Sequence, residues 1–223
     1  MNGTLFIVAT PIGNLKDITL RAIEILKSVD VIVCEDTRRT TILLNHYEIH
    51  KRLISCYDAI EEQKSDEILS ILKNGNSVAL VSDSGMPLIS DPGFRVVRKA
   101  REAGIKIDVI PGPTAFVSAL VLSGLRVDRF IFLGFIPKSK SKALKIFSEI
   151  RSFSGTIIIY ESCHRLLKTI DFIEKELKVE KITLVRELTK LHQEVITDTI
   201  SKIKTCLTGE KKRGEFVILF EFS

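Results

Sequence analysis

Short runs of strand-forming residues alternate with segments of helical periodicity over the first 125 residues, and this alternation constrains the fold more than any other feature. The runs are apolar and have the length of buried strands. We predict strands at residues 5–9, 29–34, 53–55, 77–82 and 106–110, and helices at residues 19–27, 37–45, 61–73, 92–103 and 114–123. Alternation of this kind predicts a mostly parallel sheet with helices on both faces.

The pattern changes after residue 125, where a polar stretch precedes a new series of strands. We predict these strands at residues 130–135, 156–160, 181–186, 194–197 and 215–222. The short gap between residues 186 and 194 suits an antiparallel pair better than a crossover connection. We therefore expect two α/β domains. Residues 1–115 form one with a mostly parallel sheet, and residues 125–223 form one with a mixed sheet.

The composition is that of a soluble globular protein, with 45% hydrophobic and 27% charged residues. No apolar run reaches the roughly 18–20 residues that span a bilayer, and the first residues lack the basic segment of a signal peptide. We therefore expect a cytoplasmic protein without membrane contact. The cysteines form no Cys-x-x-Cys pair, so we expect buried free thiols and neither a metal site nor a disulfide framework.

The net charge of +5 is a mild bias that is compatible with a nucleic-acid partner. Basic residues gather at two places in the second half of the chain. These are Lys138, Lys140, Lys142 and Lys145 after Pro137, and the run Lys211-Lys212-Arg213. Each group either contacts phosphates or forms a solvated face, and the sequence leaves both interpretations open.

Loops rich in Gly and Pro follow three of the strands predicted for the parallel sheet. They cover residues 10–17, 82–93 and 110–115. In an open parallel sheet, ligands bind at the carboxyl ends of the strands, so three such loops at one edge indicate a ligand cleft. None of them contains Gly-x-Gly-x-x-Gly or Gly-Lys-Ser/Thr, which favours a small nucleoside-like ligand over a dinucleotide.

Eight motifs in order along the chain carry a family resemblance. They read "TPIGNLKDITLRA", "CEDTRRT", "SDSGMPLISDPG", "PGPTA", "FLGFIPK", "YESCHRL", "ELTK" and "GEFVI". Together they closely resemble the ribosomal RNA small-subunit methyltransferase I family, whose members are S-adenosylmethionine-dependent ribose 2′-O-methylases of the tetrapyrrole methylase superfamily. The chain differs from the usual family pattern at Ser84 and Met86, where Ala and Thr are common.

The resemblance implies a two-domain tetrapyrrole-methylase-like α/β fold, with the methyl donor S-adenosyl-L-methionine in the cleft between the domains. It also implies a homodimer and, as substrate, a cytidine in the decoding region of 16S ribosomal RNA, either free or in the small ribosomal subunit. Carried over by position, the donor-binding residues are Pro11, Ser82, Asp83, Gly85, Pro111, Gly112, Phe132, Leu133, Gly134, Tyr160, Glu161, Ser162 and Leu188.

Methyl transfer from a sulfonium requires no metal, because in-line placement of the reacting groups provides most of the acceleration. A base near the ribose 2′-hydroxyl would help. The candidate catalytic residues are Glu35, Asp36 and Glu161. For two of them a structural role is an alternative, because Asp36 suits a helix N-cap and Glu161 lies four residues before Arg165.

The candidates for binding RNA phosphates are Arg21, Arg38, Lys138, Lys140, Arg165 and Lys190. Methylation of a base usually requires aromatic stacking surfaces, and we expect Phe130, Phe132 and Phe135 to pack in the core instead. This shortage of aromatic surface favours ribose as the target. The alternative functions are methylation of tetrapyrrole carbon atoms and a non-catalytic RNA-binding module.

Overall fold

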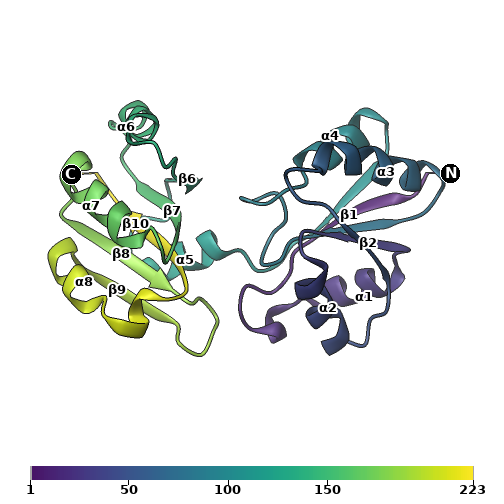
Figure 1. Ribbon diagram of the computed structural model, residues 1–223, viewed down its shortest axis with the longest axis horizontal. Coiled ribbons are helices and arrows are strands. Elements are labelled where there is room, and N and C mark those ends of the chain that lie inside the picture. Colours follow the sequence, from purple (N-terminus) through teal and green to yellow (C-terminus); the bar gives the residue numbers. More distant parts are fainter. Residues whose placement is uncertain (1, 223) are drawn as a thin grey trace. The chain divides into compact units, whose positions relative to one another are not determined.

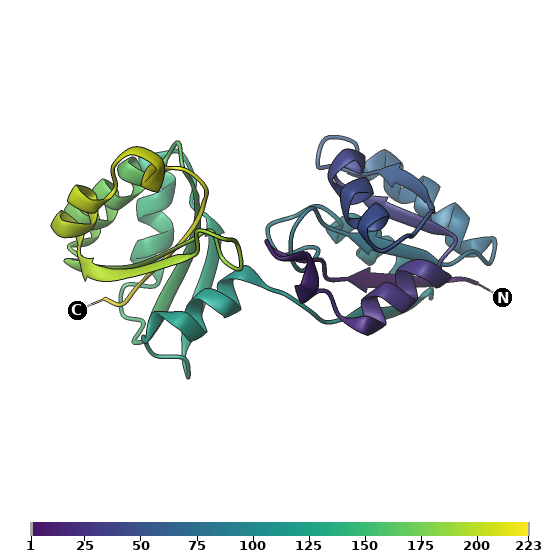
Figure 2. The same ribbon diagram turned by 90° about the horizontal axis from the view of Figure 1, so that it is seen from below.

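The computed structural model describes residues 2–222, apart from the side chains of Glu210 and Lys211. The chain forms two compact units, Met1–Thr114 and Ala115–Ser223, each built around its own sheet (Figure 1, Figure 2). Within the described part of the chain, no helix is both long and apolar enough to cross a membrane.

The first unit contains a sheet in the order β3-β2-β4-β1-β5, and its paired strands all run parallel. The strands are β1 (Thr4–Val8), β2 (Val31–Cys34), β3 (Arg52–Ser55), β4 (Val78–Val81) and β5 (Lys106–Ile110). β2 and β4 are buried along their whole length, as expected for central strands that are covered on both faces. The predicted parallel sheet is confirmed.

Helices cover both faces of this sheet (Figure 1). They are the 3₁₀ turn η1 (Leu15–Asp17), α1 (Leu20–Ser28), α2 (Thr37–His46), α3 (Glu61–Lys73) and α4 (Phe94–Glu102). Leu26 of α1 and Leu44 of α2 pack on one face, whereas Ile68 of α3 and Val96 of α4 pack on the other. Each connection returns the chain to the side of the sheet where the strands begin. The carboxyl ends of all five strands therefore lie along one edge of the sheet.

The second unit contains a mixed sheet in the order β6-β7-β10-β8-β9. Its elements are α5 (Ala115–Ser123), β6 (Phe130–Phe135), α6 (Lys140–Glu149), β7 (Thr156–Ser162), α7 (Leu166–Leu177), β8 (Lys181–Arg186), β9 (Glu194–Thr199), α8 (Ile200–Cys206), η2 (Gly209–Lys212) and β10 (Glu215–Phe220). β6 and β7 are parallel and the other pairs are antiparallel. The predicted antiparallel pair around residues 186 and 194 is confirmed, whereas α6, α7 and α8 lie in segments with no predicted element.

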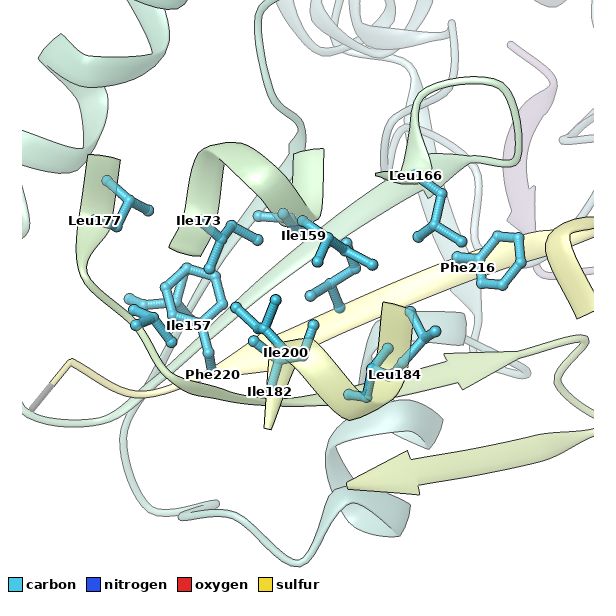
Figure 3. Packing of buried hydrophobic residues seen from close by; sticks show 14 of the residues in the cluster. Ile157, Ile159, Leu166, Ile173, Leu177, Ile182, Leu184, Ile200, Phe216 and Phe220 are labelled. Atoms are coloured by element: carbon cyan, nitrogen blue, oxygen red, sulfur yellow. The ribbon is translucent and has the colours of Figure 1, made fainter. Parts of the chain in front are cut away.

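The core of the second unit lies between the sheet and helices α6, α7 and α8. Figure 3 shows Ile157 and Ile159 of β7 packed with Ile173 of α7 and Phe220 of β10. The amphipathic face of α7 supplies Leu166, Ile170, Ile173 and Leu177 at helical spacing, which is the pattern of a helix that buries one stripe.

The expectation that the aromatic residues of β6 pack in the core is wrong for Phe130 and Phe135, which are 42% and 53% exposed. β6 is an edge strand, and its pairing with β7 shifts between Phe132 and Phe135, where Gly134 has a φ of +61°. This bulge changes the direction of the side chains that follow it. The second unit therefore has exposed aromatic surface, and the argument from composition for ribose over base loses its support.

The cysteines also differ from expectation in part. Cys34 and Cys56 are buried free thiols, as expected, but Cys163 is only half-buried and Cys206 is exposed. Cys206 is the last residue of the short helix α8, and its thiol is accessible to solvent.

Candidate active site

The loops after β1 and β4 are joined at the carboxyl edge of the parallel sheet. Thr10 and Gly85 exchange two backbone hydrogen bonds, of 2.9 and 3.1 Å. The hydroxyl groups strengthen the junction, because Ser82 Oγ donates to the carbonyl oxygen of Gly85 (3.0 Å) and Thr10 Oγ1 donates to that of Ser82 (3.1 Å). The predicted meeting of these two loops is confirmed.

The loop after β5 lies against the loop after β1. The backbone N–H of Ala9 donates to the carbonyl oxygen of Ile110 (3.2 Å), and a Cβ at Gly112 would lie only 2.9 Å from the Cβ of Ala9. This close approach alone requires glycine at position 112. A bulky substitution of Gly112 would therefore disturb the packing of the loops whether or not a ligand binds there.

Asp36 is the N-cap of α2. Its Oδ1 accepts hydrogen bonds from the Arg38 backbone N–H (2.9 Å) and Nε (3.0 Å), and its Oδ2 accepts one from Arg38 Nη2 (2.7 Å). The hydrogen bonds from Arg38 lower the pKa of Asp36 to about 2. The capping alternative for Asp36 is confirmed, and its catalytic role stays a prediction.

Asp83 connects the end of β4 to the start of α2. Its Oδ1 accepts a hydrogen bond from the backbone N–H of Asp36 (3.0 Å), and its Oδ2 pairs with Arg39 Nη1 (3.4 Å). Both carboxylate oxygens thus have partners within the unit. Asp83 positions the loop after β2 against the loop after β4, across 47 residues of sequence.

Glu35 differs from these neighbours. Among the described residues, no group donates a hydrogen bond to its carboxylate, and burial followed by the nearby Asp83 carboxylate raises its pKa. Burial, followed by the charge of Glu35, also raises the pKa of Asp91 to about 7. The sheet edge therefore holds two carboxyl groups with raised pKa values, of which Asp91 is able to bind a proton near neutral pH. Asp91 is absent from the predicted site residues, and its place in the long Gly/Pro-rich loop is the signal that points to it.

A polar cavity of about 440 Å³ opens at this edge. It is lined by Glu35, Asp36, Thr37, Arg38, Ser55, Tyr57 and Asp83. Ser55 Oγ donates to the carbonyl oxygen of Glu35 (3.0 Å), which holds the ends of β2 and β3 together. Ser55 and Tyr57 are lining residues that the sequence motifs did not include.

The predicted donor residues of the second unit gather at one edge of its sheet. Phe135 pairs with Tyr160 across β6 and β7, Ser162 pairs with Glu215 at the start of β10, and Phe216 pairs with Arg186 at the end of β8. The segments 132–134 and 160–162 and Leu188 therefore lie along this edge. Leu188 is buried between Glu187 and Thr189, which both have positive φ, of 49° and 61°.

Glu161 is fully buried within this unit. It accepts hydrogen bonds from Thr169 Oγ1 (2.5 Å) and the Ser162 backbone N–H (2.8 Å), and Arg165 Nη2 lies 3.4 Å from it. The alternative that Glu161 pairs with Arg165 is confirmed. These contacts join the end of β7 to the start of α7, and a catalytic role for Glu161 stays a prediction.

Most of the predicted phosphate-binding cations already have partners in the structure. Arg21 pairs with Asp108 (2.7 Å), Lys140 with Glu176 (2.8 Å), and Lys190 with Glu187 (3.0 Å). Arg165 also donates to the carbonyl oxygen of Ile136 (2.9 Å). Lys138 and Lys142 are exposed, whereas the side chain of Lys211 lies outside the described residues. Within the described part of the chain, no group of three or more His, Cys, Asp or Glu side chains is arranged to hold a metal ion.

The family model that matches this chain is described as Tetrapyrrole (Corrin/Porphyrin) Methylases and spans residues 4–204. Solved structures with a similar fold include diphthine synthase (TM-score 0.76, 16% identity, covering 98% of this chain and 89% of that one). Another is a cobalt precorrin-4 methyltransferase (TM-score 0.71, 17% identity, covering 97% and 93%). These likenesses concern the fold alone. The family match, which covers most of the chain, defines its class as a member of the Tetrapyrrole (Corrin/Porphyrin) Methylases family.

Two curated relatives are similar to almost the whole chain. One, from Pasteurella multocida, is 45% identical over 99% of this chain and 80% of its own length. The other, from Thermotoga maritima, is 42% identical over 97% of each. Both are named Ribosomal RNA small subunit methyltransferase I. This chain therefore belongs to the ribosomal RNA small subunit methyltransferase I family, and it is a methyltransferase.

Proposed function

We propose that this enzyme transfers a methyl group from S-adenosyl-L-methionine to the 2′-hydroxyl of a cytidine in the decoding region of 16S ribosomal RNA. The observation that carries the proposal is the polar cavity at the edge of the parallel sheet, with Glu35 as an unpaired carboxylate among the described residues that line it. The relatives named as small-subunit methyltransferases support RNA as the substrate. The choice of ribose and of the cytidine comes from the motif resemblance.

The acidic character of the same edge supports a cationic methyl donor. The Asp83 carboxylate lies close enough to raise the pKa of both Glu35 and Asp91, so the edge is acidic and favours a positively charged sulfonium. The donor supplies the electrophilic methyl group, and the residues of this edge bind and orient it. The loops with Pro11, Ser82, Gly85 and Pro111 offer backbone groups for its polar parts, and the donor-binding roles of the second unit's residues stay proposals.

The decisive experiment is methylation of small ribosomal subunits from cells that lack the modification. We expect label from S-adenosyl-L-methionine in 2′-O-methylcytidine after digestion of the RNA to nucleosides and mass spectrometry. Label on the cytosine ring, or no transfer to RNA at all, would overturn the proposal. The second of these outcomes would return tetrapyrrole methylation or simple RNA binding to consideration.

Calorimetric titration with the donor tests the acidic edge separately. Asp83→Asn removes a charge while it keeps an oxygen acceptor, and we expect at least a fivefold weaker affinity for S-adenosyl-L-methionine. Asp66→Asn, at an exposed position of α3, is the matched control and should bind as the wild type does. Equal affinities for the two variants would contradict the acidic-edge argument.

We also propose a homodimer that is located in the cytoplasm with its ribosomal substrate. Helix α5 supports self-association, because it carries no charged residue and exposes Val117, Val121 and Leu122 to solvent, with Val121 at 72%. Analytical ultracentrifugation at several concentrations measures the oligomeric state. Val121→Glu should shift the protein toward the monomer, and a monomeric wild type at micromolar concentration would contradict this part of the proposal.

A further inference from the structure

The polar cavity of the first unit has walls of three different chemical kinds. One wall is aromatic, because Tyr57 follows β3 and is 44% exposed. Another is formed by carboxylates, and the third by the first residues of α2 with Arg38. A volume of about 440 Å³ lies in the lower part of the range for small-molecule sites and suits one nucleoside rather than a longer segment of RNA.

The carboxylates of the cavity are not equivalent. Asp36 caps the N-terminus of α2 and pairs with the Arg38 side chain. Asp83 accepts a hydrogen bond from the Asp36 backbone N–H and pairs with Arg39. Glu35 is the lining carboxylate for which the described residues supply no hydrogen-bond donor. A ligand hydroxyl or amino group is the kind of partner that a partly buried carboxylate requires.

The charge of the cavity limits what it binds. Three carboxylates face one guanidinium among the lining residues, which disfavours a phosphate inside the cavity. The Arg38 side chain is 88% exposed, which places it at the rim of the cavity. There it is able to contact phosphates that stay outside the cavity. A ribose with its hydroxyl groups and an aromatic base meets these requirements, since Tyr57 presents an aromatic surface to the base.

We propose that this cavity binds the acceptor nucleoside, with Tyr57 stacked on its base and Glu35 accepting the proton of the ribose 2′-hydroxyl. This inference rests on the proposed function. In the transfer, the 2′-oxygen forms a bond to the methyl carbon and the bond from that carbon to sulfur breaks. Its electron pair stays on sulfur, the neutral thioether leaves, and the hydroxyl proton goes to the Glu35 carboxylate.

The surroundings of Glu35 suit a proton acceptor. Burial and the Asp83 carboxylate raise its pKa, with smaller contributions in the same direction from Asp58 and Asp36 and an opposing one from Arg39. Asp91, which itself titrates at about 7, is coupled to Glu35. A base is most effective when its pKa lies near the working pH.

The test separates binding of the nucleoside from the proton transfer. Tyr57→Ala should raise KM for the small ribosomal subunit at least tenfold, and Tyr57→Phe should restore it to within threefold of wild type, because the ring remains. Glu35→Gln should lower kcat by 100-fold or more with little change in KM, and the wild-type rate should fall as pH is lowered through the pKa of Glu35.

Controls keep the result interpretable. Phe94→Ala and Glu24→Gln replace exposed side chains of the same kinds on α4 and α1, away from the cavity, and should behave as wild type. Donor affinity by calorimetry and the thermal midpoint should be unchanged for the Tyr57 variants. If the wild type methylates ribose and neither Tyr57→Ala nor Glu35→Gln changes its kinetics, this inference is wrong and the proposed function stands. If the wild type does not methylate RNA, both are wrong.

Discussion

The sheet edges of the two units differ, because only the first holds carboxylates with raised pKa values beside its paired ones. In the first unit, Glu35 and Asp91 have raised pKa values because burial outweighs any partner. In the second unit, the motif carboxylates Glu161 and Glu187 are held by hydrogen bonds from neighbouring groups. Unpaired buried carboxylates cost stability and are common at reactive sites, whereas paired ones hold structure together.

The pKa of Glu187 illustrates the second case. Although its burial alone would raise the pKa, hydrogen bonds from the Glu215 backbone N–H and from Lys190 lower it overall. The same side chain lies close to Gly214, so it fastens the loop of Leu188 to the start of β10. The comparison teaches that a carboxylate in a family motif can serve to hold neighbouring segments together.

The largest effect should come from removing the buried carboxylate of the second unit. Glu161→Ala leaves Arg165, the Ser162 backbone N–H and Thr169 without their shared acceptor, so we expect about 3–5 kcal/mol of destabilisation. Urea unfolding measures it. Thr169→Val removes one of these bonds and is the matched control, which should cost about 1 kcal/mol. A loss of activity with unchanged stability in Glu161→Ala would instead assign Glu161 to catalysis.

The opposite sign is expected for Asp91→Asn in the first unit. The folded pKa of Asp91, about 7, exceeds its usual value, so its contribution to stability is complete below about pH 4 and is lost as pH rises through 7. Above pH 7 the variant should be more stable than wild type by on the order of 2 kcal/mol, after allowance for solvent screening. Unfolding curves at pH 5 and pH 8 test this. A variant that is less stable at pH 8 would show that the contact of the Asp91 carboxylate with Ser82 outweighs the cost of burying its charge.

RNA affinity should depend on exposed lysines of the second unit that lie outside both candidate ligand-binding edges. We expect Lys138→Glu with Lys142→Glu to weaken binding of small ribosomal subunits roughly tenfold, because fewer counterions are released on binding. Filter binding between about 50 and 200 mM salt should also give a shallower salt dependence than wild type. Donor affinity serves as the control and should not change. An unaltered salt dependence would place the RNA on another surface.

The smallest effect concerns backbone strain alone. Lys178 is the C-cap of α7 and has a φ of 57°, a conformation that glycine adopts without cost. Lys178→Gly should stabilise the protein by up to about 1 kcal/mol, as thermal unfolding would show. Lys175→Gly, in the last turn of the same helix, is the matched control and should destabilise by about 1 kcal/mol. Destabilisation by both variants would show that Lys178 makes a side-chain contact that matters more than its backbone.

Local pattern predicted much of this molecule. The strands of both sheets follow from short apolar runs, and the parallel sheet from their alternation with helices, because periodicity in sequence reflects the geometry of each element. Helices α6, α7 and α8 escaped prediction, although α7 has a regular apolar stripe. The meeting of the loops after β1, β4 and β5 was predictable as well, since parallel strands place their carboxyl ends at one edge.

The sequence by itself determined the family, the two kinds of sheet and the edge where the candidate site lies. Only the tertiary structure decided which carboxylate is free, because Asp83 reaches Asp36 across 47 residues while Glu35 has no such partner among the described groups. It also decided that Phe130 and Phe135 are exposed and that Tyr57 lines the cavity. The physical reason is that pairing and burial depend on strand register and loop packing, which join residues far apart in the chain.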